Sequence, residues 1–161
     1  MKTSHNIPLT NMTWNLFPCR KERAVYERHK TKSRDNSKNL CICIDGMDQS
    51  KTHLPHFLSK EKGTAQLWTL RTHITGALIH HTGPHGKDAN IFINTADIPS
   101  DTNLTLHVLL ASLEQYVKAH NALPETLYLQ FDNCWRENKN QFVLAFAFFL
   151  VAIGIIKKVS T

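Results

Sequence analysis

Short apolar runs, each separated from the next by polar or turn-forming residues, recur along the 161-residue chain. A strand needs only about four to eight such residues, so these runs predict strands. The predicted strands span 40–44, 66–71, 73–81, 89–94 and 127–131. The first and the last do not alternate with polar residues, which is typical of strands that are buried on both faces.

Two further segments have helical character. Residues 103–121 carry an apolar face, and Ser100 or Asp101 can cap this helix. The segment from Gln141 to about Ile153 is almost entirely apolar and also predicts a helix. The order of strands, helix, strand and helix indicates an α/β or α+β layout for a domain over residues 39–161, and of the two we expect α/β.

The N-terminal segment, residues 1–38, differs in composition from this domain. It holds nine Lys and Arg and three acidic residues, which accounts for the whole net charge of +6. Helix formers over 19–32 predict a helix, residues 1–18 are expected to be irregular with Pro8 and Pro18 as breakers, and 33–39 forms a polar connector. A basic segment beside a neutral domain favours a polyanionic partner, although a solvated basic helix without a partner fits equally well.

The four cysteines form no C-x-x-C pair and have no zinc-type spacing with His: Cys19, Cys41, Cys43 and Cys134. No apolar signal segment opens the chain. We therefore expect reduced thiols in an intracellular protein, with the nucleus included among its locations.

The apolar run over 142–156 has two interpretations. A membrane-spanning helix needs about 20 residues, and this run is shorter. The pair Lys157 and Lys158 would suit a tail anchor. A helix that packs against the sheet is the simpler interpretation, and no membrane contact is expected.

Two of the apolar strands end in an aspartate, Asp45 after 40–44 and Asp132 after 127–131. If these strands are parallel neighbours, the two carboxylates lie side by side and repel each other unless a cation joins them. Mg²⁺ prefers oxygen ligands and is often held by one or two carboxylates together with a substrate phosphate. The alternative is that each aspartate simply begins a turn.

Other polar residues could contribute to a site. His80, His81 and His85 flank a turn and could bind a metal, although such histidines are usually solvated. Asp48 and Lys51 follow Asp45 closely enough to reach a bound phosphate, or they serve as ordinary loop charges.

The residues around both aspartates resemble a known family. The stretch CICIDGMDQSKTHLPHF at 41–57, then ITGALIHH at 74–81, NLTLHVLL at 103–110 and LPETLYLQFDNCWRENKNQFVLAF at 123–146 are similar to an uncharacterised family of transposon-derived proteins. Those proteins are regarded as similar to ribonuclease H-like integrases and DDE transposases.

This resemblance implies a ribonuclease H-like mixed sheet flanked by helices, with Asp45 and Asp132 as the first two acidic metal ligands. It implies Mg²⁺ or Mn²⁺ as cofactor and DNA as partner, with the basic segment 20–38 as a candidate contact. Asn133, Glu137, Asn138 and Lys139 match the second block, where Glu137 could act as a third acid and Asn133 and Lys139 could bind substrate phosphate. Relatives continue into a further strand and a block with His and Asp, so we expect a domain that is incomplete at its C-terminus.

Three functions follow as hypotheses. The first is a transposase- or integrase-like catalytic core fragment whose ancestral activity is Mg²⁺-dependent cleavage or transfer of DNA phosphodiester bonds, impaired here by the missing third acid. The second is a non-catalytic remnant that binds nucleic acid or protein. The third is a tail-anchored protein that uses residues 142–156.

Overall fold

A computed structural model describes residues 10–48, 51–56, 68–95, 97–131 and 141–161, with the backbone alone for 10–20. The elements follow one another as helix α1 (Thr10–Asp35), strands β1 (Asn39–Gly46), β2 (Thr72–His80) and β3 (Lys87–Thr95), helix α2 (Thr102–His120), strand β4 (Thr126–Phe131), helix α3 (Gln141–Ala152) and strand β5 (Lys158–Ser160). The protein is therefore of the α/β class, as the sequence predicts.

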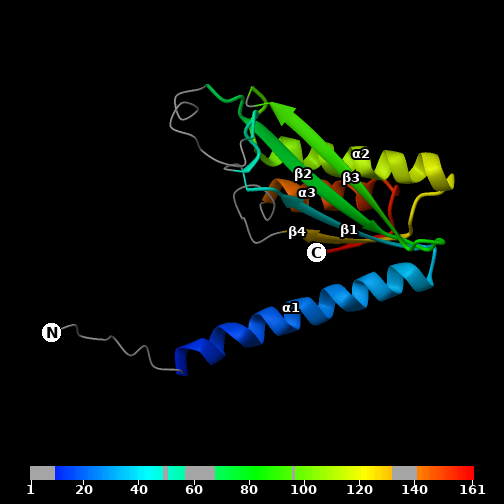
Figure 1. Cartoon of the computed structure of the whole chain (residues 1–161). Coiled ribbons are helices and arrows are strands. Elements are labelled where there is room, and N and C mark those ends of the chain that lie inside the picture. The colour runs from blue at the N-terminus through cyan, green and yellow to red at the C-terminus, as the bar shows by residue number, and fades with distance from the viewer. Residues whose placement is uncertain (1–9, 49–50, 57–67, 96, 132–140) are drawn as a thin grey trace.

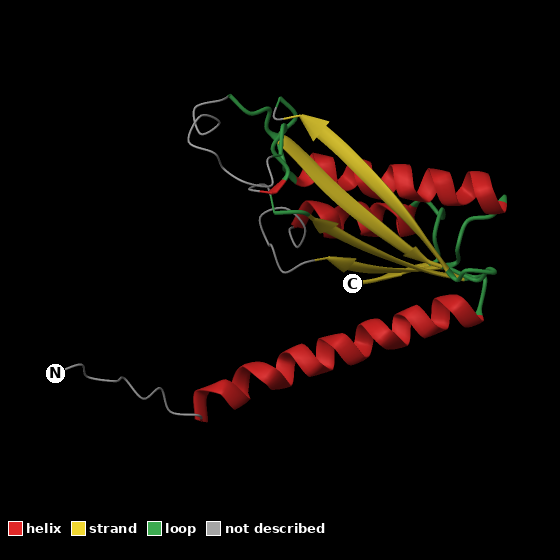
Figure 2. Ribbon diagram, in the orientation of Figure 1, coloured by secondary structure: helices red, strands yellow, loops and turns green. Residues whose placement is uncertain are grey.

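The strands form one mixed sheet in the order β3-β2-β1-β4-β5. β1 pairs antiparallel with β2, and β2 antiparallel with β3, whereas β4 is parallel to both β1 and β5. Helices α2 and α3 cover one face of the sheet, and α1 lies on the other (Figures 1 and 2). The α/β class and the five-stranded sheet flanked by helices are thus established for the described residues.

The core lies between the central strands and helices α2 and α3. Leu40, Ile42 and Ile44 of β1 are almost fully buried, and so are Leu127 and Leu129 of β4. Burial of each such side chain stabilises the fold by about 1.5–3 kcal/mol. From α2 and α3 the core receives Val108, Leu109, Leu113, Tyr116, Val143 and Leu150. The continuous apolar runs therefore form the centre of the sheet, as their lack of alternation predicts.

The opposite face of the sheet packs against α1 through polar contacts. The His29 ring stacks on Tyr128 of β4 at 4.2 Å between centroids. The hydroxyl of Tyr26 lies 2.8 Å from Nε2 of His80 on β2. Burial, followed by the nearby Cys43 and Cys41, raises the pKa of Tyr26 to about 12, so this hydroxyl stays protonated.

The start of β4 is held by charges from two other parts of the chain. The Glu125 carboxylate lies 3.1 Å from Nζ of Lys38 and 3.2 Å from Nζ of Lys157. The backbone amides of Lys157 and Lys158 both donate to the Glu125 carbonyl. These hydrogen bonds precede the pairing of β4 with β5. Strand β5 was not predicted from the sequence.

Two predicted elements are wrong in their extent. Residues 68–71 do not form a strand, since Leu70 makes only an isolated bridge to Leu54. Helix α1 is longer than the predicted 19–32 and passes through Pro18, which was expected to break it. A proline removes one backbone hydrogen bond from a helix. Helix α1 nevertheless continues on both sides of Pro18.

Helix α3 is buried on one side only. Val143, Ala147 and Leu150 face the core, whereas Phe148 is 76% exposed and Phe142 is 60% exposed. The prediction that this segment packs against the sheet is therefore correct for one of its faces. Among the described residues, no helix has the length and apolar character that crossing a membrane requires.

Helix attachment through His80 should make stability depend on pH. Burial, and then the positive charges of Arg34, Lys30 and Lys87, lower the pKa of His80 from 6.5 to about 4, while Glu27 opposes this shift. Between these two pH values the unfolded chain gains a proton at this position that the folded chain resists, so the free energy of unfolding falls as the pH falls.

Thermal melts across this window test the effect against a His80→Gln variant, whose side chain does not titrate. We expect the parent chain to lose more stability than the variant as the pH drops from 6.5 to 4. Equal losses in the two proteins would show that His80 contributes nothing to the pH dependence.

Candidate metal site at the ends of two parallel strands

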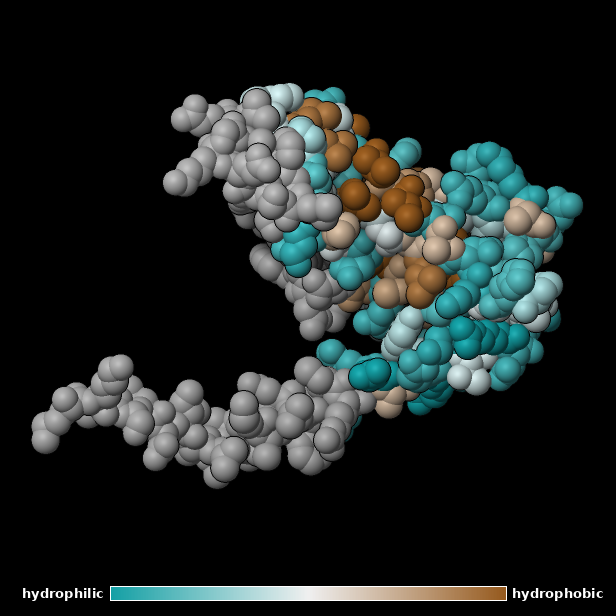
Figure 3. All heavy atoms as spheres, viewed as in Figure 1, coloured by the Kyte–Doolittle hydropathy of each residue, from teal (hydrophilic) through white to brown (hydrophobic). Residues whose placement is uncertain are grey.

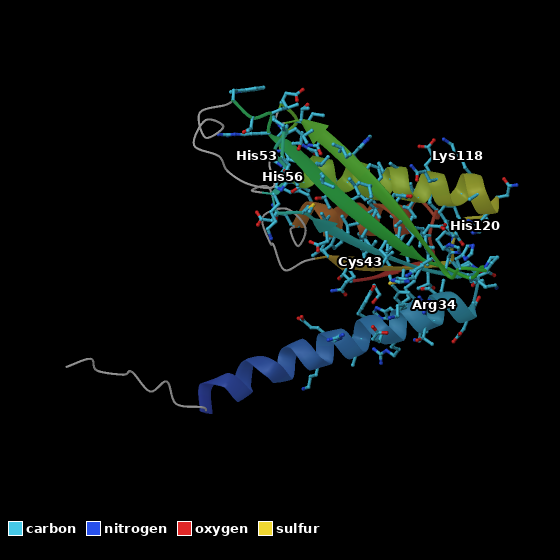
Figure 4. The ribbon with its side chains drawn as sticks, in the orientation of Figure 1. Arg34, Cys43, His53, His56, Lys118 and His120 are labelled. Carbon is cyan, nitrogen blue, oxygen red and sulfur yellow. The ribbon has the colours of Figure 1, made fainter. Side chains whose placement is uncertain are left out.

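Asp45 lies near the carboxyl end of β1 and is exposed. Along β1 it follows Cys41 and Cys43 at every second position, so the three side chains point toward the α1 face of the sheet. Burial, and then the Asp45 carboxylate, raise the pKa of the Cys43 thiol. Figure 4 shows Cys43 between the sheet and α1.

The pairing of β1 with β4 ends immediately before both aspartates. The last pair in the parallel register is Ile44 with Phe131. Asp45 follows the first of these residues. In the sequence Asp132 follows the second, and it lies outside the described residues. The condition set by the sequence, that the two strands are parallel neighbours, is therefore met.

The other neighbour of Asp45 leaves space beside its side chain. Across the antiparallel pair with β2, Asp45 lies opposite Gly76, which has no side chain. Within the described part of the chain, no Lys, Arg or His forms an ion pair with Asp45. An exposed carboxylate without a cationic partner is a suitable oxygen donor for a hard divalent cation.

The segment that follows β1 is attached to the start of β2. The hydroxyls of Thr52 and Thr72 each donate to the backbone carbonyl of the other residue. In the same segment, Nζ of Lys51 lies 3.8 Å from the Asp48 carboxylate, and both side chains are largely exposed. Asp48 and Lys51 are thus placed at the same end of the sheet as Asp45.

Several predicted site residues lie outside the described part of the chain: Asp132, Asn133, Glu137, Asn138 and Lys139. Within the described part, no group of three or more His, Cys, Asp or Glu residues could hold a metal ion. Of the two predicted metal ligands, Asp45 is therefore described by the structure and Asp132 is not.

A cavity that sequence reasoning missed lies beside the end of β4. It has a volume of 250 Å³ and lies between α1 and the sheet, next to Gln130 and Phe131. The α1 side is lined by Lys21, Glu22, Val25 and His29. Helical spacing could have grouped these four residues, but only the fold shows that they face β4.

A smaller cavity of 110 Å³ lies on the α2 side of the β1 end and includes His73 and Asp101. The Asp101 carboxylate accepts hydrogen bonds from the amides of Asn103 and Leu104, at 2.9 and 3.2 Å. Asp101 is therefore the N-cap of α2, and it is one of the two residues predicted for that role. Its Oδ1 atom accepts both of these hydrogen bonds.

The histidines considered as an alternative metal site lie at the other end of the sheet. Asp45 pairs with Gly76 and Cys41 with His80, so His80 is roughly 13 Å farther along the strands. Nε2 of His81 lies 2.9 Å from Asp88, and the His81 ring contacts that of His120 at 4.7 Å. Figure 4 shows His120 at this end of the molecule, and His53 and His56 at the opposite end. His80 and His81 thus connect α1 and α2 to the sheet.

The C-terminal part of the chain matches a protein family model. A family model described as a domain of unknown function, DUF7869, matches residues 62–161, which is more than half of the chain. This range includes β2 to β5 and the segment that carries Asp132 and Glu137. No curated protein matches the chain.

The role of Asp101 as a helix cap can be separated from a role in metal binding. Asp101→Ala should lower the free energy of unfolding by about 1 kcal/mol, because two amides of α2 lose their acceptor. Asp101→Asn keeps an acceptor and should restore most of this loss, as measured by urea denaturation. Neither change should alter binding of Mn²⁺, and a loss of metal binding in Asp101→Asn would instead make Asp101 a ligand.

Proposed function

The chain belongs to the DUF7869 family, and from the ends of β1 and β4 we propose a ribonuclease H-like protein of the transposase or integrase type. In this proposal Asp45 and Asp132 together bind Mg²⁺ or Mn²⁺. The ancestral reaction is cleavage or transfer of DNA phosphodiester bonds. The mixed five-stranded sheet between helices is consistent with this fold.

The parallel register of β1 and β4 carries the proposal. Neighbouring strands lie about 4.8 Å apart. In the sequence, an aspartate directly follows the last paired residue of each strand. Two neighbouring carboxylates repel each other when both are ionised, which would favour a shared cation. Open parallel sheets commonly bind ligands just beyond the carboxyl ends of their strands, where Asp45 lies.

The surrounding residues have roles that follow from their charge. When bound, a divalent cation would offset the charge of both carboxylates and of a substrate phosphate. Lys51, at the same end of the sheet, is a candidate phosphate contact, and Asp48 orients it through their ion pair. Glu137 is proposed as a third acid, and Asn133 and Lys139 as substrate contacts.

Helix α1 is the proposed DNA contact. Lys21, Arg28 and Lys32 are exposed and follow one another at helical spacing on one side of the helix. Lys21 also lines the 250 Å³ cavity at the end of β4, so this side of α1 reaches the candidate site. Phosphate contacts of this kind provide affinity that does not depend on sequence.

Metal binding should depend on both aspartates. At a Mn²⁺ concentration about 100 times the dissociation constant, the parent chain should gain roughly 2.7 kcal/mol of stability. Asp45→Asn and Asp132→Asn should each lose this gain. Without metal, each variant should be slightly more stable than the parent, because one of two repelling charges is removed.

The same variants test the activity. With Mg²⁺ or Mn²⁺ and a DNA substrate, any cleavage or strand transfer by the parent should fall by more than about 100-fold in either variant. Asp35→Asn, an exposed acid at the end of α1, is the matched control and should change neither property. A parent chain that shows neither metal-induced stabilisation nor cleavage would exclude the enzyme, and DNA binding alone would favour the non-catalytic alternative.

Binding of DNA should depend on salt through α1. Replacing Lys21, Arg28 and Lys32 with Gln should weaken binding of single-stranded DNA and lower the slope of log affinity against log salt by roughly 0.7 for each phosphate that is no longer neutralised. Lys118→Gln, on α2, is the control for removal of a surface charge. Binding that is independent of salt, or equal in the triple variant, would contradict the proposed contact.

A further inference from the structure

Residues 51–54 and 70–72 form a short paired base at the Asp45 end of the sheet. The backbone amide of Leu54 donates to the Leu70 carbonyl at 2.9 Å, and the Leu70 amide donates to the Leu54 carbonyl at 2.7 Å. Next to this bridge, the buried Thr52 and Thr72 exchange hydrogen bonds from hydroxyl to carbonyl. The base is therefore fixed to the start of β2.

Trp68, two residues before Leu70, exposes its indole to solvent. At 80% exposed it is the most exposed large apolar side chain among the described residues. Leu54 and Leu70 of the base are 51% and 37% exposed. An indole has a large apolar area that is favourable to cover, so an exposed one on a fixed base indicates a binding surface.

Positive charge accompanies this apolar surface. Arg71 lies three residues after Trp68 and is exposed, and within the described part of the chain it forms no ion pair. Lys51, in the other segment of the base, is also exposed and lies 3.8 Å from Asp48, a pair that contributes little at such a position. An aromatic ring with cations nearby suits an unpaired nucleic-acid strand, because a base can stack on the ring while phosphates meet the charges.

Two other exposed apolar surfaces lack this pattern of charge. Figure 3 shows hydrophobic side chains over β2 and β3, where Ile91 and Ile93 are 70% and 67% exposed. The two charges of β3, Lys87 and Asp88, have opposite signs. Helix α3 has no charged residue. Complementarity to a polyanion is therefore found beside Trp68 and not on these two surfaces.

We propose that Trp68 stacks on an unpaired base of the DNA strand bound at the candidate site, with Lys51 and Arg71 contacting its phosphates. This inference rests on the proposed function and adds the form of the substrate, which is single-stranded near the site. A base within a duplex is already stacked on its neighbours, and its face is not available to the indole. Because the base that carries Trp68 is already ordered, binding has little ordering to pay for in entropy.

The position of Trp68 fits a strand that also reaches Asp45. Asp45 pairs with Gly76, and Trp68 precedes Gly76 by eight residues, which can span at most about 29 Å. A DNA strand advances by about 3.4 Å per nucleotide in a duplex, and an unpaired strand can be more extended. The stacked base therefore lies within about ten nucleotides of a phosphate at Asp45.

Binding of a labelled oligothymidylate of about 12 nucleotides to the full chain, measured by fluorescence anisotropy, tests the proposal. EDTA in the buffer removes metal, so the result does not depend on the proposed metal pair. Trp68→Ala should weaken binding roughly 5- to 150-fold, the range that follows from loss of one stacked base. Trp68→Phe keeps an aromatic face and should retain most of the affinity.

Two further measurements separate stacking from a loss of charge or of fold. Trp68→Ala should leave the slope of log affinity against log salt unchanged, whereas Lys51→Gln and Arg71→Gln should each lower it by roughly 0.7. Affinity for a duplex of the same length should be the same in Trp68→Ala and in the parent. Phe148→Ala, at a residue that is 76% exposed on α3, is the matched control and should bind the oligothymidylate as the parent does.

Undiminished oligothymidylate binding by Trp68→Ala, or an equal loss of duplex binding, would overturn the stacking proposal. A parent without affinity for the oligothymidylate would also overturn it and would leave Trp68 as a contact for protein. The result is separable from that of the proposed function. Weakened binding by Trp68→Ala with no cleavage by the parent would support this inference and exclude the enzyme. Cleavage that depends on Asp45, with full binding by Trp68→Ala, would overturn this inference alone.

Discussion

The parallel pairing of β1 with β4 is the constraint on which the rest of the structure depends. Its register sets Leu127 and Leu129 of β4 level with Leu40 and Ile42 of β1, so that all four enter the core under α2 and α3. A slip of one residue would turn the β4 side chains toward the other face. The same slip would move the strand end that precedes Asp132 away from the level of Asp45. One register therefore specifies both the core and the candidate site.

The two faces of the sheet are held by different forces. Apolar burial fixes α2 and α3, whereas α1 is attached through hydrogen bonds and ring stacking around Tyr26, His29 and Ser33. These contacts lie in the C-terminal half of α1. Lys21, nearer its N-terminus, lines the cavity at the end of β4. Helix α1 is therefore attached to the sheet through its C-terminal half, and it reaches the end of β4 nearer its N-terminus. Protonation of His80 would weaken that attachment.

The sequence predicted those elements whose pattern or contacts lie within a few neighbouring residues, and it missed those that depend on contacts between distant segments. The buried strands β1 and β4 were predicted because a short, continuous apolar run between turn residues is typical of a strand with both faces covered. The α2 cap was predicted because Asp101 bonds amides only two and three residues away. In contrast, β5 has three residues, two of them polar, and it forms where the backbone amides of Lys157 and Lys158 donate to the carbonyl of Glu125, just before the neighbouring strand β4. No pattern within 158–160 could have indicated that contact.

The candidate site shows the same division. Both strand-end aspartates could be found in the sequence, but whether β1 and β4 are neighbours is a property of the sheet. The cavity beside β4 was missed because its walls, 21–29 and 129–131, are about a hundred positions apart along the chain. The segment 66–71 was mistaken for a strand because its apolar residues suit one, yet its described part bridges only to Leu54.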